Sequence, residues 1–329
     1  MQDWVEKRQK TLALCTKQSL KALDFTDDRL EAVLRYLSDD GSWQEFESEL
    51  GSSLVRVYDL QKEKIRLDTT TASGYCGITD DGLFQWGHSK DYRPDLAQVK
   101  IMLATIDPLG MPLVTEVLPG NSADDPLYVP AIERVRDTLS NRGHLYIGDC
   151  KMAARRYADP ASRIATRAHL ASGGDYYLCP LSATQLNSEQ LESLLEPVWK
   201  KTIELTTIDY DYANGKTEKI AVGYECSRSC TTSLEGKEYT WTERMFVVRS
   251  LKSAVSSEKS LRTRLSKAEA ALSELGKPCR GKKKLSSIAD WQEAVEAILL
   301  EYPRPRFVQS RFSTYYRTAF KKSISRSSC

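Results

Sequence analysis

Two aspartates occupy positions from which β-sheet enzymes hold catalytic metal ions. Asp68 lies within a strand-like run, Ile65 to Thr71, and Asp149 follows the short apolar run 145–148. Carboxylates at the ends of neighbouring strands project into the crevice at the edge of a sheet. Such a pair suits Mg²⁺ or Mn²⁺, and two of these ions can act on the attacking and leaving oxygens of a phosphodiester. Aspartates at strand ends also cap turns and helices, so position alone leaves both roles open.

The residues around these aspartates predict a mixed α/β domain. Runs rich in β-branched and apolar residues predict strands at 65–71, 99–106, 111–118, 145–148 and 176–181. The second and third strands flank Asp107-Pro108-Leu109-Gly110, which suits a hairpin closed by a type I turn. Helices are predicted from Asp125-Pro126 to about 140 and over 161–171. This order predicts a mixed sheet with helices on its faces.

The remaining segments predict three further regions around this core. Residues 1–53 form an N-terminal helical segment, in which Thr26-Asp27-Asp28 starts a helix and Gly51-Ser52-Ser53 is a linker. Residues 54–195 are the first part of the catalytic core. Residues 196–250 are a β-rich insertion with a hairpin at Asn214-Gly215. Residues 251–329 hold an amphipathic helix over 251–275 and then a basic C-terminal region.

Positive charge is concentrated at the C-terminal end. Residues 244–329 hold 19 Lys and Arg against 7 Asp and Glu, a balance of +12, whereas the other residues hold 28 against 38, a balance of −10. This asymmetry is typical of a protein that binds a polyanion, most often nucleic acid. The cluster Lys282, Lys283 and Lys284 is therefore a predicted DNA-binding segment. A solvated basic helix face followed by a tail explains the charge equally well.

The composition indicates a water-soluble protein and argues against several classes of enzyme. Hydrophobic residues make up 41% of the chain and charged residues 28%, and no apolar run is long enough to span a bilayer. The N-terminal stretch MQDWVEKRQK lacks the apolar region of a secretory signal, so we expect a cytoplasmic protein. Neither a Walker A sequence nor a Gly-x-Ser-x-Gly motif occurs, which argues against ATP use and serine hydrolase chemistry.

Five sequence words give the two aspartates a more specific context. RLDTTTASGY surrounds Asp68, and YIGDCKMA surrounds Asp149. Between them stand GHSKDYRPDLAQ at 87–98 and LPGNSADD at 118–125, and WTERMFVVRS follows at 241–250. In this order the words resemble DDE transposases of the IS4-like group, most closely the IS1634-type branch. The resemblance covers roughly residues 28–275.

The resemblance implies a ribonuclease-H-like fold in which Asp68 and Asp149 are the first two catalytic acids. Both would be metal ligands and together would hold two Mg²⁺ or Mn²⁺ ions. The substrate would be double-stranded DNA, at the ends of an insertion sequence and at the target, bound by a homodimer associated with the nucleoid. The family's chemistry is strand cleavage by an activated water, followed by attack of the freed 3′-hydroxyl on target DNA.

The third acid of this family has no recognisable counterpart in the sequence. It belongs to a helix beyond the insertion, within a Tyr, Arg, Glu signature that we do not find before Cys329. The available glutamates are more typical of exposed helix faces: Glu258, Glu269, Glu274 and Glu293. We therefore expect a truncated chain whose activity is in question. Two other interpretations stay open: a non-catalytic DNA-binding remnant that inhibits intact transposase, and a metal-dependent nuclease unrelated to transposition.

Polar residues of the 87–98 segment are candidates for DNA contacts near the metal site. His88, Lys90 and Arg93 have side chains suited to phosphate oxygens. A loop stabilised by its own polar groups is equally compatible with them. His144 and His169 have no acid partner at catalytic spacing and are predicted to be surface or packing residues.

Overall fold

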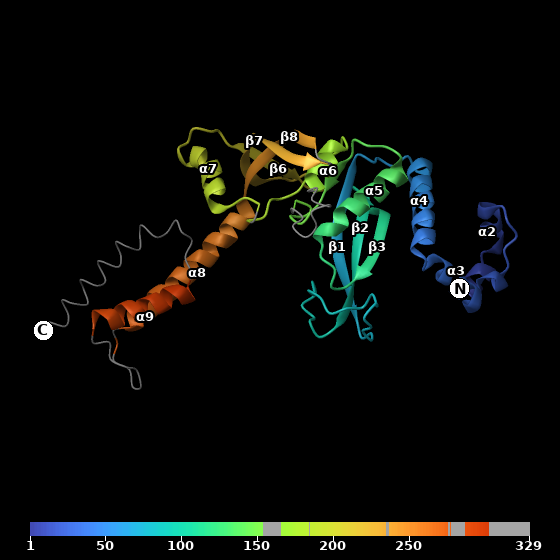
Figure 1. Ribbon diagram of the computed structural model, residues 1–329, viewed down its shortest axis with the longest axis horizontal. Coiled ribbons are helices and arrows are strands. Elements are labelled where there is room, and N and C mark those ends of the chain that lie inside the picture. The colour runs from blue at the N-terminus through green and yellow to red at the C-terminus, as the bar shows by residue number, and fades with distance from the viewer. Residues whose placement is uncertain (154–165, 184, 235–236, 276, 278–286, 303–329) are drawn as a thin grey trace. The chain divides into compact units, whose positions relative to one another are not determined.

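The computed structural model describes residues 1–153, 166–183, 185–234, 237–275, 277 and 287–302 (Figure 1). The chain divides into two compact units, and each is described by itself. The first unit comprises Met1–Ser193 and Ser227–Glu243, and the second comprises Leu194–Cys226 and Arg244–Cys329. No described helix combines the length and the apolar content needed to cross a membrane.

A five-stranded mixed sheet forms the centre of the first unit. Its order is β3-β2-β1-β4-β5. β1 pairs antiparallel with β2 and parallel with β4, β2 pairs antiparallel with β3, and β4 pairs parallel with β5. The strands are β1 (Lys64–Gly74), β2 (Ala97–Ile106), β3 (Met111–Pro119), β4 (Leu145–Ile147) and β5 (Tyr176–Leu178). The predicted mixed sheet is confirmed, and its order is compatible with a ribonuclease-H-like fold.

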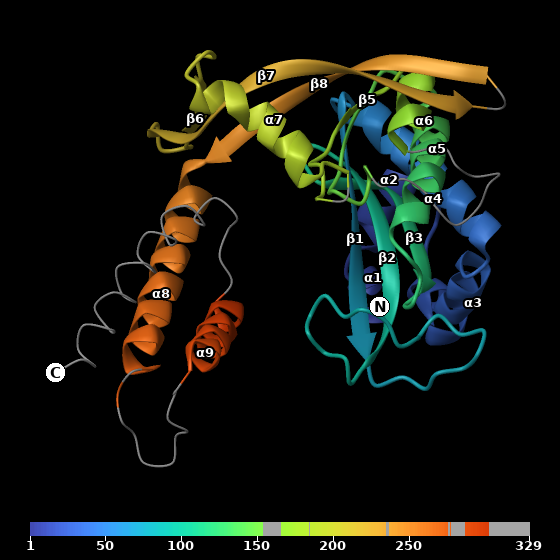
Figure 2. The ribbon, with the colours of Figure 1, turned by 60° about the vertical axis from the view of Figure 1, so that its left-hand side comes forward.

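The hydrophobic core lies against this sheet and helix α5 (Tyr128–Leu139), which runs beside β2 and β3 (Figure 2). Alternate residues of β1 are buried, so Ile65 and Leu67 enter the core while Asp68 is exposed. The apolar stripe predicted for α5 is also present, with Ile132 fully buried. A short 3-10 turn, η2 (Asp125–Leu127), precedes α5, and helix α6 (Thr166–Ser172) packs on β5.

Gly51-Ser52-Ser53 lie inside a helix and are not a linker. Helix α4 (Asp40–Val57) continues through them and packs on β3 and α5. A Cβ on Gly51 would lie 3.0 Å from Cγ2 of Thr138, and the hydroxyl of Ser52 donates to the Thr138 carbonyl at 2.6 Å. The linker prediction is wrong because these small residues serve close helix packing, a role that composition does not distinguish from a flexible turn.

The hairpin between β2 and β3 is confirmed, but its turn is wider than predicted. The closing hydrogen bond runs from the amide of Gly110 to the carbonyl of Ile106 at 2.8 Å, whereas a type I turn would close on Asp107. The Asp107–Pro108 peptide is cis.

The N-terminal residues are helical, as expected. They form α1 (Gln2–Glu6), α2 (Gln9–Thr16), the 3-10 turn η1 (Ala22–Phe25) and α3 (Asp27–Leu37). The predicted helix start is present, since the hydroxyl of Thr26 accepts from the amide of Arg29 at 3.4 Å.

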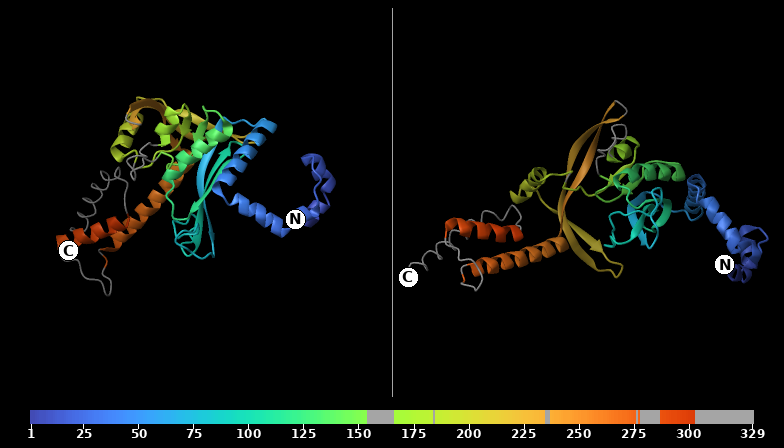
Figure 3. Two further views of the ribbon diagram at one scale, coloured as in Figure 1. Left: turned by 45° about the vertical axis from the view of Figure 1, so that its right-hand side comes forward. Right: turned by 60° about the horizontal axis from the view of Figure 1, so that its bottom comes forward.

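A three-stranded sheet follows the core, in the order β6-β7-β8. Gly215, with a φ of 79°, forms the predicted Asn214-Gly215 hairpin between β6 and β7. Helix α8 continues directly from β8 (Figure 3). The elements are α7 (Ser188–Trp199), β6 (Thr206–Asp211), β7 (Thr217–Leu234), β8 (Lys237–Ser250), α8 (Leu251–Leu275) and α9 (Ile288–Glu301).

Helix α7 is present although the sequence analysis did not predict it. A signal was available, because Asn187 and Gln190 exchange side-chain and main-chain hydrogen bonds at 2.8 and 3.0 Å, as residues at a helix start do.

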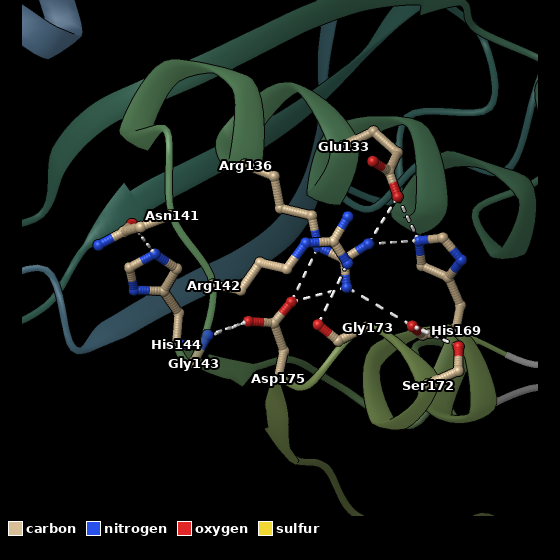
Figure 4. A network of polar contacts seen from close by, with 10 residues as sticks. All are labelled: Glu133, Arg136, Asn141, Arg142, Gly143, His144, His169, Ser172, Gly173 and Asp175. Atoms are coloured by element: carbon tan, nitrogen blue, oxygen red, sulfur yellow. Dashed lines mark hydrogen bonds and ion pairs between the residues drawn. The ribbon is translucent and has the colours of Figure 1, made fainter.

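A buried polar network joins α5, α6 and the start of β5 (Figure 4). The Nε of Arg136 donates to Oδ2 of Asp175 at 2.8 Å, and Oδ1 of Asp175 accepts from the amide of Gly143 at 2.6 Å. Nε2 of His169 lies 2.5 Å from Oε1 of Glu133. Buried charges need such partners, so the network fixes these elements against one another.

The expectation for the two histidines is therefore half right. His144 is 3% exposed and has Nδ1 2.6 Å from the carbonyl of Lys62, which makes it a packing residue. His169, however, has an acid partner in Glu133, which α5 brings next to it from 36 positions earlier in the sequence. Burial, aided by the charge of Arg136, lowers the pKa of His169 below its ordinary value.

Candidate metal and phosphate site

Asp68 and Asp149 occupy equivalent positions relative to the paired residues of two neighbouring parallel strands. The last paired residues of β1 and β4 are Arg66 and Ile147. Asp68 stands two residues beyond the first and Asp149 two residues beyond the second. The sheet thus carries both aspartates in the same direction from its two central parallel strands, at the carboxyl end of β4.

The carboxylate of Asp68 is open to solvent. Its side chain is 78% exposed, and Oδ1 accepts from the amide of Thr69 at 2.8 Å. The ammonium group of Lys90 lies 4.0 Å from the same oxygen and donates to the carbonyl and the hydroxyl of Thr69, the latter at 3.0 Å. The side chain of Asp68 is therefore oriented by the main chain of its own strand.

The carboxylate of Asp149 is held by two donors. Its Oδ1 accepts from the phenol of Tyr128 at 2.7 Å and from the amide of Lys151 at 2.8 Å. Tyr128 is fully buried, and burial, followed by the hydrogen bond to Asp149 and the charge of that carboxylate, raises the pKa of its phenol far above the ordinary value. The phenol therefore keeps its proton at neutral pH and remains a donor to Asp149.

A buried ion pair fixes the segment from which α5 begins. The Nζ of Lys100 lies 2.6 Å from Oδ1 of Asp124, and the two side chains are 10% and 19% exposed. Burial alone would raise the pKa of Asp124, but the hydrogen bond and charge of Lys100, with the charge of Lys90, lower it below its ordinary value. Asp124 therefore stays ionised, and the start of α5 is tied to β2 close to Tyr128.

The loop that carries Lys90 is anchored to the sheet through Gln98. This residue is fully buried, and its Nε2 donates to the carbonyls of His88 at 3.2 Å and Gly120 at 3.0 Å. A Cβ on Gly87 would lie 2.2 Å from the carbonyl oxygen of Gly120, so the two segments approach as closely as glycine allows. Both glycines belong to the sequence words that suggested the family resemblance.

The structure brings one of the three cations predicted for this loop to Asp68. Lys90 reaches Asp68, whereas Arg93 pairs with Asp95 through two hydrogen bonds of 2.8 and 2.7 Å. That pairing raises the pKa of Arg93. His88 is exposed and contacts Gln98 through its carbonyl. Lys282, Lys283 and Lys284 lie outside the described residues.

No described group of three His, Cys, Asp or Glu side chains has the geometry to hold a metal ion. The four glutamates considered as a third acid lie on α8 and α9, in the second unit. Two of them have basic partners: Glu258 pairs with Arg262 at 2.7 Å, and Glu274 pairs with Lys277 at 2.5 Å. Among the described residues, the structure therefore identifies no third metal-binding acid beside Asp68 and Asp149.

The donor chemistry of these two acids fits a hard divalent cation. Each carboxylate has its Oδ1 engaged by main-chain or phenol donors, and no described residue donates to either Oδ2. Mg²⁺ typically takes one or two protein carboxylates and completes its shell with water and substrate phosphate. Asp68 and Asp149 would hold such an ion.

A second cluster, which the sequence analysis missed, surrounds Glu243. This residue is 7% exposed and accepts from Arg167, from the phenol of Tyr177 at 2.5 Å and from Nε of Arg228 at 2.6 Å. Trp241 donates to the same phenol at 2.7 Å. The cluster ties β7 and β8 to β5 and α6 within the first unit. The sequence analysis quoted the WTER segment, but nothing in that segment indicated that its glutamate is a buried ion-pair partner.

The charges of the Glu243 cluster act on the thiol of Cys179. Burial raises the pKa of the Cys179 thiol to about 11, and the charges of Arg167, Glu243 and Asp149 all act on it. Cys179 follows β5 directly. The thiol is therefore within electrostatic reach of both Asp149 and the buried glutamate.

No protein-family model matches the chain, and no curated protein matches it. A cryo-EM structure of a piggyBac transposase synaptic complex with hairpin DNA is 9% identical over 66% of this chain and 44% of that one, with a TM-score of 0.29. A crystal structure of Ciona intestinalis endonuclease V, in complex with a 24mer DNA containing an inosine followed by a ribo-adenosine, is 10% identical over 56% of this chain and 76% of that one, with a TM-score of 0.21. The chain spans less than half the length of that transposase.

Proposed function

We propose that this chain is a DNA transposase of the DDE type, in the IS1634-type branch of the IS4-like group. The observation that carries the proposal is the matched position of Asp68 and Asp149 on two neighbouring parallel strands, each with one carboxylate oxygen engaged. The order of the sequence words around these residues supports the same family. The mixed sheet is compatible with the fold that this family implies.

The reaction would have two steps on double-stranded DNA. In the first, a water oxygen attacks the phosphorus of a phosphodiester at the element end, and the bond to the leaving 3′-oxygen breaks, giving a 3′-hydroxyl and a 5′-phosphate. In the second, that 3′-hydroxyl attacks a phosphodiester of the target, so one P–O bond forms while another breaks. Neither step changes an oxidation state.

Each residue of the site would have a separate task. Asp68 and Asp149 would hold Mg²⁺ or Mn²⁺ through their carboxylates, and the phenol of Tyr128 would keep Asp149 in one orientation. Bound divalent cations supply charge stabilisation at a phosphodiester and lower the pKa of a coordinated water. Lys100 and Asp124 would hold α5, and therefore Tyr128, in register with β4.

Metal binding tests the proposal directly. Electron paramagnetic resonance of Mn²⁺ should show binding to the wild-type chain and its loss in Asp68→Asn and in Asp149→Asn. Asp107→Asn is a matched control, because Asp107 also adjoins a strand of this sheet but is paired with Arg66 at 2.7 Å. Equal Mn²⁺ affinity in all four proteins would contradict the assignment of the site.

DNA cleavage separates the transposase from a DNA-binding protein without catalytic activity. Incubation of the wild-type chain with supercoiled plasmid and Mn²⁺ should give nicked product, and Asp68→Asn should abolish it. If the wild type, Asp68→Asn and Asp149→Asn all bind the plasmid and none of them nicks it, the result would favour the alternative of a DNA-binding remnant that inhibits intact transposase.

A further inference from the structure

The ammonium group of Lys90 lies beside Asp68, but the ion pair between the two side chains is weak. It lies 4.0 Å from Oδ1, beyond the length of a direct hydrogen bond, and its donations go to Thr69. The two side chains are 40% and 78% exposed, and exposed ion pairs of this kind contribute little to stability. Folding therefore does not depend on this pair.

The second lysine of the site is bound far more tightly. Lys100 is buried and forms its ion pair with Asp124 at 2.6 Å. Of the two ammonium groups beside these carboxylates, the one on Lys90 is therefore the one that can leave. Its flexible four-carbon stem allows the group to change partners without movement of the main chain.

The charge of the site opposes the approach of a DNA phosphate. Among the described side chains whose contacts build this site, Asp68, Asp124 and Asp149 contribute three negative charges, against two positive charges from Lys90 and Lys100. A DNA phosphate would approach a site with a net negative charge, which opposes binding. A divalent cation held by the carboxylates would reverse that sign and would repel the ammonium group beside Asp68.

We propose that Lys90 exchanges partners during assembly of the active complex. Its ammonium group shields Asp68 before a metal ion arrives, and it binds a phosphate of the DNA backbone once the carboxylate holds a divalent cation. This inference rests on the proposed function, because it assumes a metal site at Asp68. The anchoring of the loop through Gln98 keeps the main chain of Lys90 near the site in both states.

The exchange predicts opposite effects of one substitution on two ligands. In the absence of DNA, Lys90→Ala should bind Mn²⁺ roughly two- to five-fold more tightly than the wild type, since a competing cation is removed. With Mg²⁺ present, the same variant should bind double-stranded DNA of mixed sequence more weakly. The slope of log affinity against log salt concentration should fall by about 1, the value for one lost phosphate contact.

Two further variants make the result specific. Lys90→Arg keeps the charge and should retain the wild-type salt slope. Lys64→Ala removes a lysine from the same strand as Asp68, four residues earlier and thus about 13 Å away along the strand, and should leave Mn²⁺ affinity unchanged. Thermal unfolding monitored by circular dichroism checks that the variants are folded.

The outcomes distinguish this inference from the proposed function. If the wild type binds Mn²⁺ but Lys90→Ala binds Mn²⁺ equally or more weakly, the shielding role is overturned and the metal site stands. If Mn²⁺ affinity rises but the DNA salt slope is unchanged, the phosphate contact is overturned. If the wild type binds no Mn²⁺ at all, the proposed function and the inference fall together.

Discussion

The phenol of Tyr128 donates to Oδ1 of Asp149 across 2.7 Å, and this bond joins the first turn of α5 to the end of β4. Because Oδ1 also accepts from the amide of Lys151, both donors hold the carboxylate through the same oxygen. The orientation of a predicted metal ligand thus depends on a fully buried tyrosine that the sequence words do not single out.

Removing that phenol should weaken metal binding without unfolding the protein. Tyr128→Phe keeps the ring in the core but leaves Asp149 with one donor. Loss of a partner that orients a metal ligand typically lowers metal affinity about 10-fold or more. Mn²⁺ titration followed by electron paramagnetic resonance measures the loss. An unchanged affinity would show that the Lys151 amide orients the carboxylate by itself.

The Lys100–Asp124 pair should make stability depend on pH at the acid end. The pKa of Asp124 is lower in the folded protein than its ordinary value of 3.8. The pair therefore stabilises the fold fully above that ordinary value, and the contribution is lost as the pH falls through the lower, folded-state pKa.

Asp124→Asn isolates this effect, because it leaves the buried Lys100 without its charged partner. At pH 7 the free energy of unfolding should fall by about 3 kcal/mol, as for other broken buried pairs. Urea unfolding of the wild type and the variant should give curves that converge as the pH is lowered below 4. A difference that persists unchanged at low pH would be evidence against the ion pair as its source.

Glu243→Gln should be among the more destabilising conservative substitutions in the chain. The glutamate neutralises two arginines and accepts from a partly buried phenol, so an amide would leave Arg167 and Arg228 poorly paired. Breaking one partner of a buried ion-pair cluster costs about 3–5 kcal/mol. Glu225→Gln is the matched control, since Glu225 pairs with Arg244 on an exposed part of the same strands. Urea unfolding should detect a change in the first variant and none in the second.

Gly120→Ala should destabilise the loop that carries Lys90. A Cβ at this position would lie 2.0 Å from the main-chain oxygen of Gln98, so main-chain atoms would have to move. Steric insertions of this kind cost about 1–3 kcal/mol. Gly77→Ala, where a Cβ meets no atom within 4 Å, should be neutral. Limited proteolysis would report the difference as faster cleavage within residues 75–96 of the first variant only.

The sequence predicted the parts of this fold that depend on local pattern. The β-branched run at 65–71 predicted the strand β1, and the apolar run before Asp149 predicted β4. The mixed sheet was predicted from the succession of a hairpin and alternating helices and strands along the chain. These features are readable because each depends on residues within one segment.

The contacts that shape the site depend on residues far apart in the sequence and were not readable in this way. Tyr128 contacts Asp149 because α5 packs on the sheet with its first residue next to the end of β4. Glu243 contacts Arg167, which lies 76 positions earlier in the sequence. Gly51 was misinterpreted for the same reason, since its meaning depends on Thr138 in another helix. The spacing of residues along the chain does not predict such tertiary contacts.

The pairing of β1 with β4 also fixes when the site can come into existence during folding. Lys64 pairs with Leu145, which lies 81 positions later, whereas the β2–β3 hairpin closes over a few residues. Long-range pairings of this kind form slowly, because the intervening chain must be ordered first. The two carboxylates therefore become neighbours only when the parallel pair closes. Under the proposed function, uptake of Mn²⁺ during refolding would report when the central sheet closes, and a nascent chain would bind the ion only after both strands had been synthesised.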